Sequence, residues 1–374
     1  MSKVIMIGCD LHDKTMLLKI ALGRQEAETC SVKNTAAGRA KMIRALKQRA
    51  AAAGGARILF AYEASGQGFG LHDELTDAGI ECHVLAPTRI ARSQRAASQK
   101  TDEKDAQQLV ELLRAHVLAG NELPTVWIPD PTTRDDRELV RMRLDVAEKM
   151  TMIKSQIQSL LKRNHIRRGE AAGKGWTRLF RSWLQCTLCE SAASPLGANA
   201  RLALASLIRQ LRSLEEEERR LDEGVNGLAG AARYAAAVEE MTSLCGVGVL
   251  TALVFLTELG DLSRFANRRQ LAAYLGLAPR SFESGNANDR KGHITRQGSS
   301  RVRKMLCQAT WARVRWDKQE QQAYGRVVAK NPKKKKIAVV ASMRRLAVRM
   351  WHRGRAVPPG QPSRSMRLMA HAAG

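Results

Sequence analysis

Residues 3–10 of the chain read KVIMIGCD, and this run predicts the centre of a β-sheet. It is apolar at nearly every position, as expected of a strand whose two faces are both buried. The run ends at an acidic residue, Asp10. We therefore expect a central strand that carries a carboxylate at its C-terminal end.

The segments that follow alternate between strand and helix patterns. We predict strands at 15–22, 26–32, 57–62 and 82–86, and helices at 36–53, 70–78 and 101–119. Three strands followed by alternating helices and strands, with the first strand central, is the order of an α/β ribonuclease H-like fold. Residues 1–130 are assigned to this domain.

The pattern changes after residue 130 to apolar residues three and four positions apart. Val140, Leu144 and Ile157 belong to one such series, which is typical of a long amphipathic helix. With a second helix at about 200–225, the pattern predicts an antiparallel hairpin with coiled-coil character over 131–235, suited to dimerisation. We expect a mainly helical C-terminal domain at 236–352 and a disordered tail at 353–374.

The charge of the chain predicts its partner. The 374 residues, enough for two or three domains, carry a formal net charge of +26, and the sequence pI is about 10.4. Such a field attracts polyanions, so nucleic acid is the expected partner and binding should weaken strongly with salt. No apolar run approaches the roughly 20 residues that span a bilayer, so we expect a cytoplasmic, nucleoid-associated protein.

The seven cysteines do not predict a disulfide or metal framework. Cys186 and Cys189 form a CxxC, but no second ligand pair stands at a suitable spacing for zinc. A structural role is therefore preferred for this pair, although its role stays open. The remaining cysteines are expected to be small buried hydrophobic residues; they are Cys9, Cys30, Cys82, Cys245 and Cys307.

Four carboxylates occupy positions where the predicted fold brings side chains together. Asp10 ends the first strand and Glu63 follows the fourth, which should be its parallel neighbour. Asp102 and Asp105 are three residues apart and so share one face of a helix. Carboxylate oxygen is the ligand that Mg²⁺ prefers, with Mn²⁺ as the alternative. The four residues therefore predict a site for two divalent ions that assist phosphoryl transfer.

Each carboxylate also has a simpler interpretation. Asp102 suits a helix N-cap, Asp10 suits a turn beside Asp13, and Glu63 suits a loop. Only the coincidence of all four at the positions of a metal site favours a catalytic role over these simpler interpretations.

The turn CGVGV, with Gly246 and Gly248, also allows two interpretations. It resembles a helix-hairpin-helix turn that contacts DNA phosphate, and it is equally compatible with a plain tight turn.

A polar segment, SFESGNANDRKG, follows at 281–292 and is expected to be a flexible loop. Its Ser284 lies among cations that could stabilise a phosphoryl group. The cations assigned to nucleic-acid binding here and in the next basic run are Arg280, Arg290, Lys291, Arg301 and Arg303. A serine hydroxyl can attack a phosphodiester, yet from chemistry alone an ordinary loop serine is preferred. Ser281 is the nearest competitor for such a role.

Several motifs together resemble one family. GCDLH around Asp10, YEASG around Glu63 and KTDEKDA around Asp102 and Asp105 are similar to the DEDD transposases of the insertion-sequence-110 family. The resemblance continues through CGVGVLTA, FANRRQLAAYLGLAPRSFESG and GHITRQGSSRVRKML, and so covers nearly the whole chain. The helical middle matches only in character.

The resemblance implies an activity and partners that composition does not. It implies a RuvC-like domain, a coiled-coil insertion and a transposase domain whose essential serine is Ser284. It also implies recombination of donor and target DNA, guided by a structured bridge RNA that pairs with both. The active site is then a composite of the RuvC-like and serine halves, in a homodimer or homotetramer.

Other functions remain compatible with the sequence. A RuvC-type junction nuclease would use the same carboxylates with activated water and form no covalent intermediate. A non-catalytic nucleic-acid-binding protein could carry a structural acidic cluster. An RNA scaffold could leave the chemistry to another protein. Because no Walker A motif is present, an ATP-driven helper of a mobile element is disfavoured.

Overall fold

The computed structural model describes residues 3–90, 101–168, 173, 175–188, 196–282, 290–330 and 332–357; the side chains at 281, 282, 290 and 291 are outside this description. The chain divides into two compact units at the boundary between Ile128 and Pro129. Within the described ranges, no helix combines the length and apolarity needed to cross a membrane. The tail predicted at 353–374 lies outside the description from residue 358 onward.

The first unit contains a five-stranded mixed sheet in the order β3-β2-β1-β4-β5. Its strands are β1 (Val4–Leu11), β2 (Thr15–Leu22), β3 (Glu28–Lys33), β4 (Arg57–Glu63) and β5 (Glu81–Leu85). The central strand β1 pairs antiparallel with β2 and parallel with β4, and β4 pairs parallel with β5. The prediction of an α/β domain built around the first strand is therefore confirmed.

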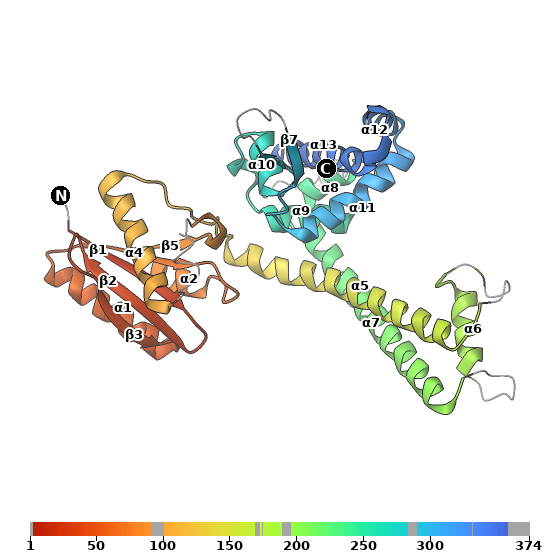
Figure 1. Ribbon diagram of the computed structural model, residues 1–374, viewed down its shortest axis with the longest axis horizontal. Helices are drawn as coiled ribbons and strands as arrows, with labels where there is room; N and C mark the ends of the chain where they lie inside the picture. Colours follow the sequence, from red (N-terminus) through yellow and green to blue (C-terminus); the bar gives the residue numbers. More distant parts are fainter. Residues whose placement is uncertain are drawn as a thin grey trace, which may run out of the picture. The chain divides into compact units, whose positions relative to one another are not determined.

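Helices cover both faces of this sheet (Figure 1). They are α1 (Ala36–Ala52), α2 (Gly70–Asp77) and α4 (Asp102–Ala119), with a short 3₁₀ turn η1 (Pro87–Arg89). Leu46 of α1 and Leu75 of α2 pack with Ile7 on one face, whereas Leu109 of α4 packs with Met6 on the other. Successive strand residues point to opposite faces, so the uniformly apolar β1 supplies both cores.

The second unit is mainly helical, as predicted. Its elements are α5 (Pro131–Arg163), α6 (Arg178–Leu188), α7 (Ala198–Gly230), α8 (Ala235–Thr242), α9 (Val249–Leu259), η3 (Leu262–Arg264), α10 (Arg268–Tyr274), β6 (Pro279–Phe282), β7 (Arg290–Ile294), α11 (Ser300–Trp316), α12 (Lys318–Lys330), η4 (Pro332–Lys334) and α13 (Lys335–Arg355). The antiparallel pair β6–β7 corrects the prediction of an uninterrupted loop at 281–292. Its strands have four and five residues, too short for a clear alternating pattern.

The long helices α5 and α7 lie side by side and extend between two hydrophobic cores (Figure 1). At one end, Val140 of α5 and Val225 of α7 are buried with α9, α11 and α13. At the other end, Ile157 and Leu204 are buried with Phe180 of α6. The apolar series that predicted these helices therefore faces two different sets of neighbours. Coiled-coil packing and dimerisation stay predictions.

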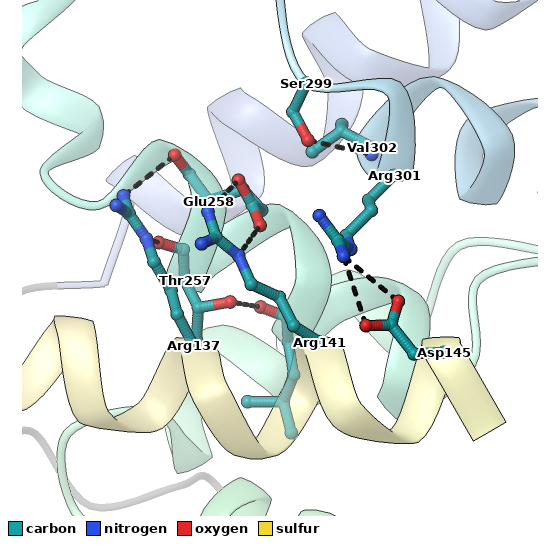
Figure 2. A network of polar contacts seen from close by, with 9 residues as sticks. Arg137, Arg141, Asp145, Thr257, Glu258, Ser299, Arg301 and Val302 are labelled. Carbon is teal, nitrogen blue, oxygen red and sulfur yellow. Dashed lines mark hydrogen bonds and ion pairs between the residues drawn. The ribbon is translucent and has the colours of Figure 1, made fainter. Parts of the chain in front are cut away.

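A group of polar contacts fixes α5 against α9 and α11 (Figure 2). Arg137 donates to the carbonyl oxygens of Thr257 at 2.5 Å and Glu258 at 3.1 Å, which satisfies acceptors in the last turn of α9. Arg141 forms a two-pronged ion pair, 2.7 and 3.2 Å, with the buried carboxylate of Glu258. Because a buried charge is costly when unpaired, these contacts fix the register of α5 on α9.

Two cysteine predictions are wrong. Cys30 and Cys245 are exposed, whereas Cys9 is buried and Cys82 and Cys307 are intermediate. Cys30 lies on β3, an edge strand whose residues are mostly exposed, although the sequence around it looks like other strands. Cys186 is exposed on α6, and Cys189 lies outside the described residues.

The N-terminus of α5 provides a test of stability. Asp130 caps this helix by accepting from the Thr133 amide at 2.9 Å and hydroxyl at 2.6 Å, and it pairs with Arg233 at 2.7 Å. The Arg233 guanidinium holds the pKa of Asp130 well below its usual range. We expect Asp130→Ala to destabilise this unit by about 1–2 kcal/mol, measured by thermal unfolding at neutral pH.

The pH dependence of this effect has a definite sign. A carboxylate with a lowered pKa stabilises the fold above its unfolded pKa, about 3.9, and this contribution is lost as the pH falls. The difference between wild type and Asp130→Ala should therefore shrink in acid. Asp135→Ala, an exposed residue in the same helical turn, is the control and should change stability little. Equal melting of the two variants would contradict the capping role.

Candidate functional site

The carboxyl ends of β1 and β4 bring two predicted site residues to one edge of the sheet. Cys9 on β1 is in register with Tyr62 on β4, and each is followed at once by an acid, Asp10 and Glu63. The two strands are parallel, so both acids leave the sheet at the same end. The Asp10 side chain is 22% exposed, and Glu63 is also partly buried.

The other two acids lie in the first turn of α4, which packs on β1, β2 and β4. Thr101 caps this helix, because its hydroxyl accepts from the Lys104 amide at 3.3 Å. Asp102 and Asp105 are therefore not the cap, although their negative charge suits the helix N-terminus. Asp102 is exposed, whereas Asp105 is partly buried.

Gly8 sets the distance between α4 and the sheet. A Cβ atom at this position would lie 2.1 Å from the Ala106 carbonyl oxygen and 2.9 Å from the Leu109 Cβ atom. No side chain fits there, so the backbone of the helix rests directly on β1. Gly8 is two residues before Asp10, and Ala106 directly follows Asp105. The close approach therefore brings the acids of the helix to the acid of the strand.

A histidine completes the group and was missed as a site residue from the sequence. The Nε2 atom of His12 lies 3.1 Å from Asp10 Oδ2 and 3.4 Å from Asp102 Oδ2. One ligand atom each from Asp10, His12 and Asp102 lie within 4.8 Å of one another. The signal was present in GCDLH, because residues two apart in an extended chain point to the same side.

The electrostatics of Asp10 show the same convergence of acids. Burial raises the pKa of its carboxyl group; His12 opposes this shift, and Asp102 and Asp105 increase it. Negative charge at Asp10 is therefore disfavoured when no cation is present. This is the expected state of a site whose carboxylates are held together by the fold rather than by mutual attraction.

These donors fit a divalent cation. Carboxylate oxygens suit hard ions, and a neutral imidazole nitrogen adds a ligand that Mn²⁺ also accepts. In the described part of the chain, Glu63 and Asp105 are not in the close group of Asp10, His12 and Asp102. The four predicted carboxylates thus share one edge of the sheet, while the tightest set of donors consists of two of them and His12.

The predicted serine lies elsewhere in the chain. The end of β6 pairs with the start of β7, with Phe282 opposite Arg290 and Ser281 opposite Lys291. Ser284 belongs to residues 283–289, which connect the two strands and lie outside the described residues. The side chains of Ser281, Arg290 and Lys291 are outside the description as well. Their catalytic and binding roles stay predictions.

The two glycines of the predicted DNA-contacting turn differ in their surroundings. Gly246 has a φ of 83°, and a Cβ atom there would lie 2.5 Å from the Ala309 carbonyl oxygen. This glycine is therefore required for packing against α11. Gly248, the residue before α9, has open space around its Cβ position. Only Gly248 leaves room for another backbone to approach.

The basic residues assigned to nucleic acid also differ in their surroundings. Arg301 pairs with Asp145 on α5 at 3.0 Å (Figure 2). Arg303 donates to the carbonyl oxygens of Gly298 at 2.5 Å and Leu275 at 3.3 Å. Both side chains therefore already hold structural contacts. Arg280 is exposed on β6.

Comparisons with known proteins agree with this organisation. A family model described as Transposase, for the DEDD transposases of the IS110 family, matches residues 7–166. A second, described as Transposase IS116/IS110/IS902 family, matches residues 238–326. The first range contains all four predicted carboxylates, and the second contains Ser284.

Individual transposases match across both ranges. A putative transposase of Sinorhizobium fredii is 31% identical over 82% of this chain and 70% of its own length. A second from the same organism is 30% identical over 77% of this chain and 75% of its own. The transposase for insertion sequence element IS1111A of Coxiella burnetii is 26% identical over 63% of this chain and 60% of its own.

The fold and these similarities define the class of protein as a transposase, which acts on DNA. The chain belongs to the IS110 family of DEDD transposases. Membership of this family, together with the donors at the sheet edge, points to the use of a divalent metal.

Gly8→Ala tests whether the approach of α4 to β1 builds the site. The added methyl group would meet backbone atoms that cannot rotate away. We expect overpacking to lower the stability of the first unit by about 1–3 kcal/mol and to weaken binding of Mn²⁺. Gly66→Ala is the control, because its Cβ position is open. A wild-type melting curve and wild-type Mn²⁺ binding for Gly8→Ala would refute this account.

Asp10→Asn should separate fold stability from metal binding. Because the folded state raises the pKa of Asp10, its contribution to stability falls as the pH rises through that range. The neutral side chain should therefore raise the melting temperature at neutral pH without metal. Mg²⁺ at a concentration 100 times its Kd for the wild type should stabilise the wild type by about 2.7 kcal/mol. The same concentration should not stabilise the variant. Asp77→Asn, exposed on α2, is the control.

Proposed function

We propose that this transposase cuts and rejoins DNA at a site formed by Asp10, Glu63, Asp102 and Asp105 with divalent metal and by Ser284 as the nucleophile. The single observation that carries the metal half is the convergence of Asp10, His12 and Asp102 within 4.8 Å. The sheet order, with its central β1 between an antiparallel and a parallel neighbour, supports a ribonuclease H-like, RuvC-like assignment of this unit.

The proposed chemistry is an exchange of phosphodiester bonds. The Ser284 oxygen attacks the scissile phosphorus, its proton passes to solvent, and the bond to one DNA strand breaks. That strand leaves with a free hydroxyl group. The phosphoserine retains the energy of the broken bond, so a hydroxyl group of another strand can displace the serine and complete the join. Divalent cations bound by the carboxylates would neutralise charge on the phosphate in both steps.

His12 has a positioning role in this proposal. Its contacts with Asp10 and Asp102 hold the two carboxylates, which come from different elements, at a fixed separation. The packing of α4 on β1 already holds these carboxylates near each other despite their repulsion. The imidazole adds to this packing by contacting both carboxylates before metal arrives.

A guide RNA and a homo-oligomer are further parts of the proposal. The similarity to the IS110 family suggests a bridge RNA that pairs with donor and target DNA, and the net charge of +26 suits two nucleic-acid partners at once. The carboxylates and Ser284 belong to different units of the chain. A composite site in a dimer or tetramer would then form only when the nucleic acids are correctly bound.

A RuvC-type junction nuclease is the second candidate. It is favoured by one observation, namely that Asp10, His12 and Asp102 converge at the sheet edge and could hold a metal ion that activates water. Metal-activated water would then cleave the phosphodiester, and no covalent intermediate would form.

The two candidate functions differ in whether a covalent protein–DNA intermediate can be trapped. We expect wild type with Mg²⁺ and labelled substrate DNA to give a protein–DNA adduct that survives denaturation. Ser284→Ala should lose the adduct, whereas Ser281→Ala, the matched control, should keep it. Asp102→Asn or removal of metal with a chelator should lower product formation by a factor of about 100 or more, since several kcal/mol of charge stabilisation is removed. Cleavage without an adduct would favour the nuclease, and an adduct in Ser284→Ala would exclude this serine.

A further inference from the structure

A pocket rimmed by arginine lies between α10 and α13, within the second unit. Its volume is about 510 Å³. The lining residues are Arg268, Arg269, Ala341, Arg344, Arg345, Val348 and Arg349. The five from α13 follow a spacing of three and four residues, so they form one face of this helix. The neighbouring face of α13 is buried in the core.

The charge of this pocket is only partly balanced. Arg345 pairs with the buried carboxylate of Glu320 at 2.5 Å and donates to the Ser342 hydroxyl at 2.8 Å. Arg349 interacts electrostatically with Asp317. Within the described ranges, no ion pair or hydrogen bond involves the side chains of Arg268, Arg269 or Arg344. The rim therefore combines several guanidinium groups with little opposite charge.

Other arginines in the same unit are paired with carboxylates. Arg141 pairs with Glu258, and Arg143 contacts Glu218 and Asp222 at 2.8 and 2.7 Å. The excess of charge at the pocket is thus a local feature and not a property of every arginine here. Neighbouring like charges repel each other, and an anion relieves this repulsion. A ligand with several negative charges fits this rim.

The apolar part of the pocket lining, Ala341 and Val348, is called its floor here and narrows the choice of ligand. Ala341 and Val348 are apolar and lie among the arginines on the same face of α13. Guanidinium groups bind phosphate through paired hydrogen bonds and also stack on aromatic rings, which ammonium groups do less well. A volume of about 510 Å³ is within the range of pockets that enclose small organic groups. An unpaired base can enter such a space. The bases of a duplex cannot, because they are stacked inside the double helix.

We propose that this arginine pocket binds a single-stranded segment of nucleic acid, with phosphates on the rim and one unstacked base on the apolar floor. The inference rests on the proposed function in one respect, namely that the protein handles nucleic acid. It assigns a new binding site to α10 and α13. The strand is DNA opened during recombination or an unpaired part of the proposed RNA; the phosphodiester chemistry is common to both.

The test measures binding of the full-length protein to three fluorescent probes by anisotropy. The probes are a single strand of DNA, the same sequence as RNA, and the corresponding DNA duplex. Arg268→Ala combined with Arg344→Ala should weaken binding of at least one single strand about tenfold and weaken duplex binding less. The slope of log K against log salt should fall by about 1.4, because each lost contact to a single strand contributes about 0.7.

Two further variants separate the pocket from general charge. Arg209→Ala combined with Arg212→Ala removes the same charge from exposed positions on α7 and should leave the single-strand Kd within about twofold. Ala341→Leu changes no charge but fills the floor, and it should weaken single-strand binding about threefold or more while duplex binding is kept.

The outcomes separate the two proposals. Weaker binding of one single-strand probe, DNA or RNA, by the pocket variants supports the proposed site and identifies which nucleic acid it binds. Equal losses for duplex and single strands, or equal effects of the α7 control, would overturn the pocket as a single-strand site. If its variants bind every probe normally while Asp102→Asn still abolishes cleavage, the pocket proposal fails and the proposed function stands. If the wild type binds no probe and cuts no DNA, both fail.

Discussion

The contact between Gly8 and the first half of α4 is the constraint on which the candidate site depends. Any side chain at residue 8 would overlap the Ala106 carbonyl oxygen, so the helix lies on the central strand at backbone distance. The residues beside this contact, Asp10 on the strand and Asp105 on the helix, are thereby held near each other. Their negative charges repel, and burial of Asp10 adds a further cost. The packing of the sheet and helix must supply the free energy that keeps this arrangement when no cation is bound.

Much of the first unit could be predicted from the sequence because its strongest signals are local. The apolar run of β1 and the boundaries of α1 follow from patterns of a few residues, and they agree with the structure closely. The metal group was predicted only in part. The spacing of His12 from Asp10 is a local signal, but its contact with Asp102, which is distant in the sequence, depends on the fold. The exposure of Cys30 likewise depends on the position of β3 at the edge of the sheet.

The basic residues show a different limit of sequence reasoning. A run of arginines predicts attraction to nucleic acid as a whole, but the partner of each side chain depends on tertiary contacts. Arg301 and Arg303 are held by Asp145 and by backbone carbonyl groups, whereas Arg268 and Arg344 face an open pocket. Arg268 and Arg344 come from segments far apart in the chain. Only the packing of α10 on α13 brings them together, and no spacing along the chain could have indicated this.

The continuity of α5 has a mechanical consequence. This helix has 33 residues and so spans about 50 Å. One end is fixed to α9 by Arg137 and Arg141, and the other is buried with α6 in a separate core (Figure 1). A continuous helix that is held at both ends keeps a fixed spacing between the α6 core and the helix bundle. A displacement of one core along the helix axis therefore has to move the other, unless the helix itself bends or unfolds.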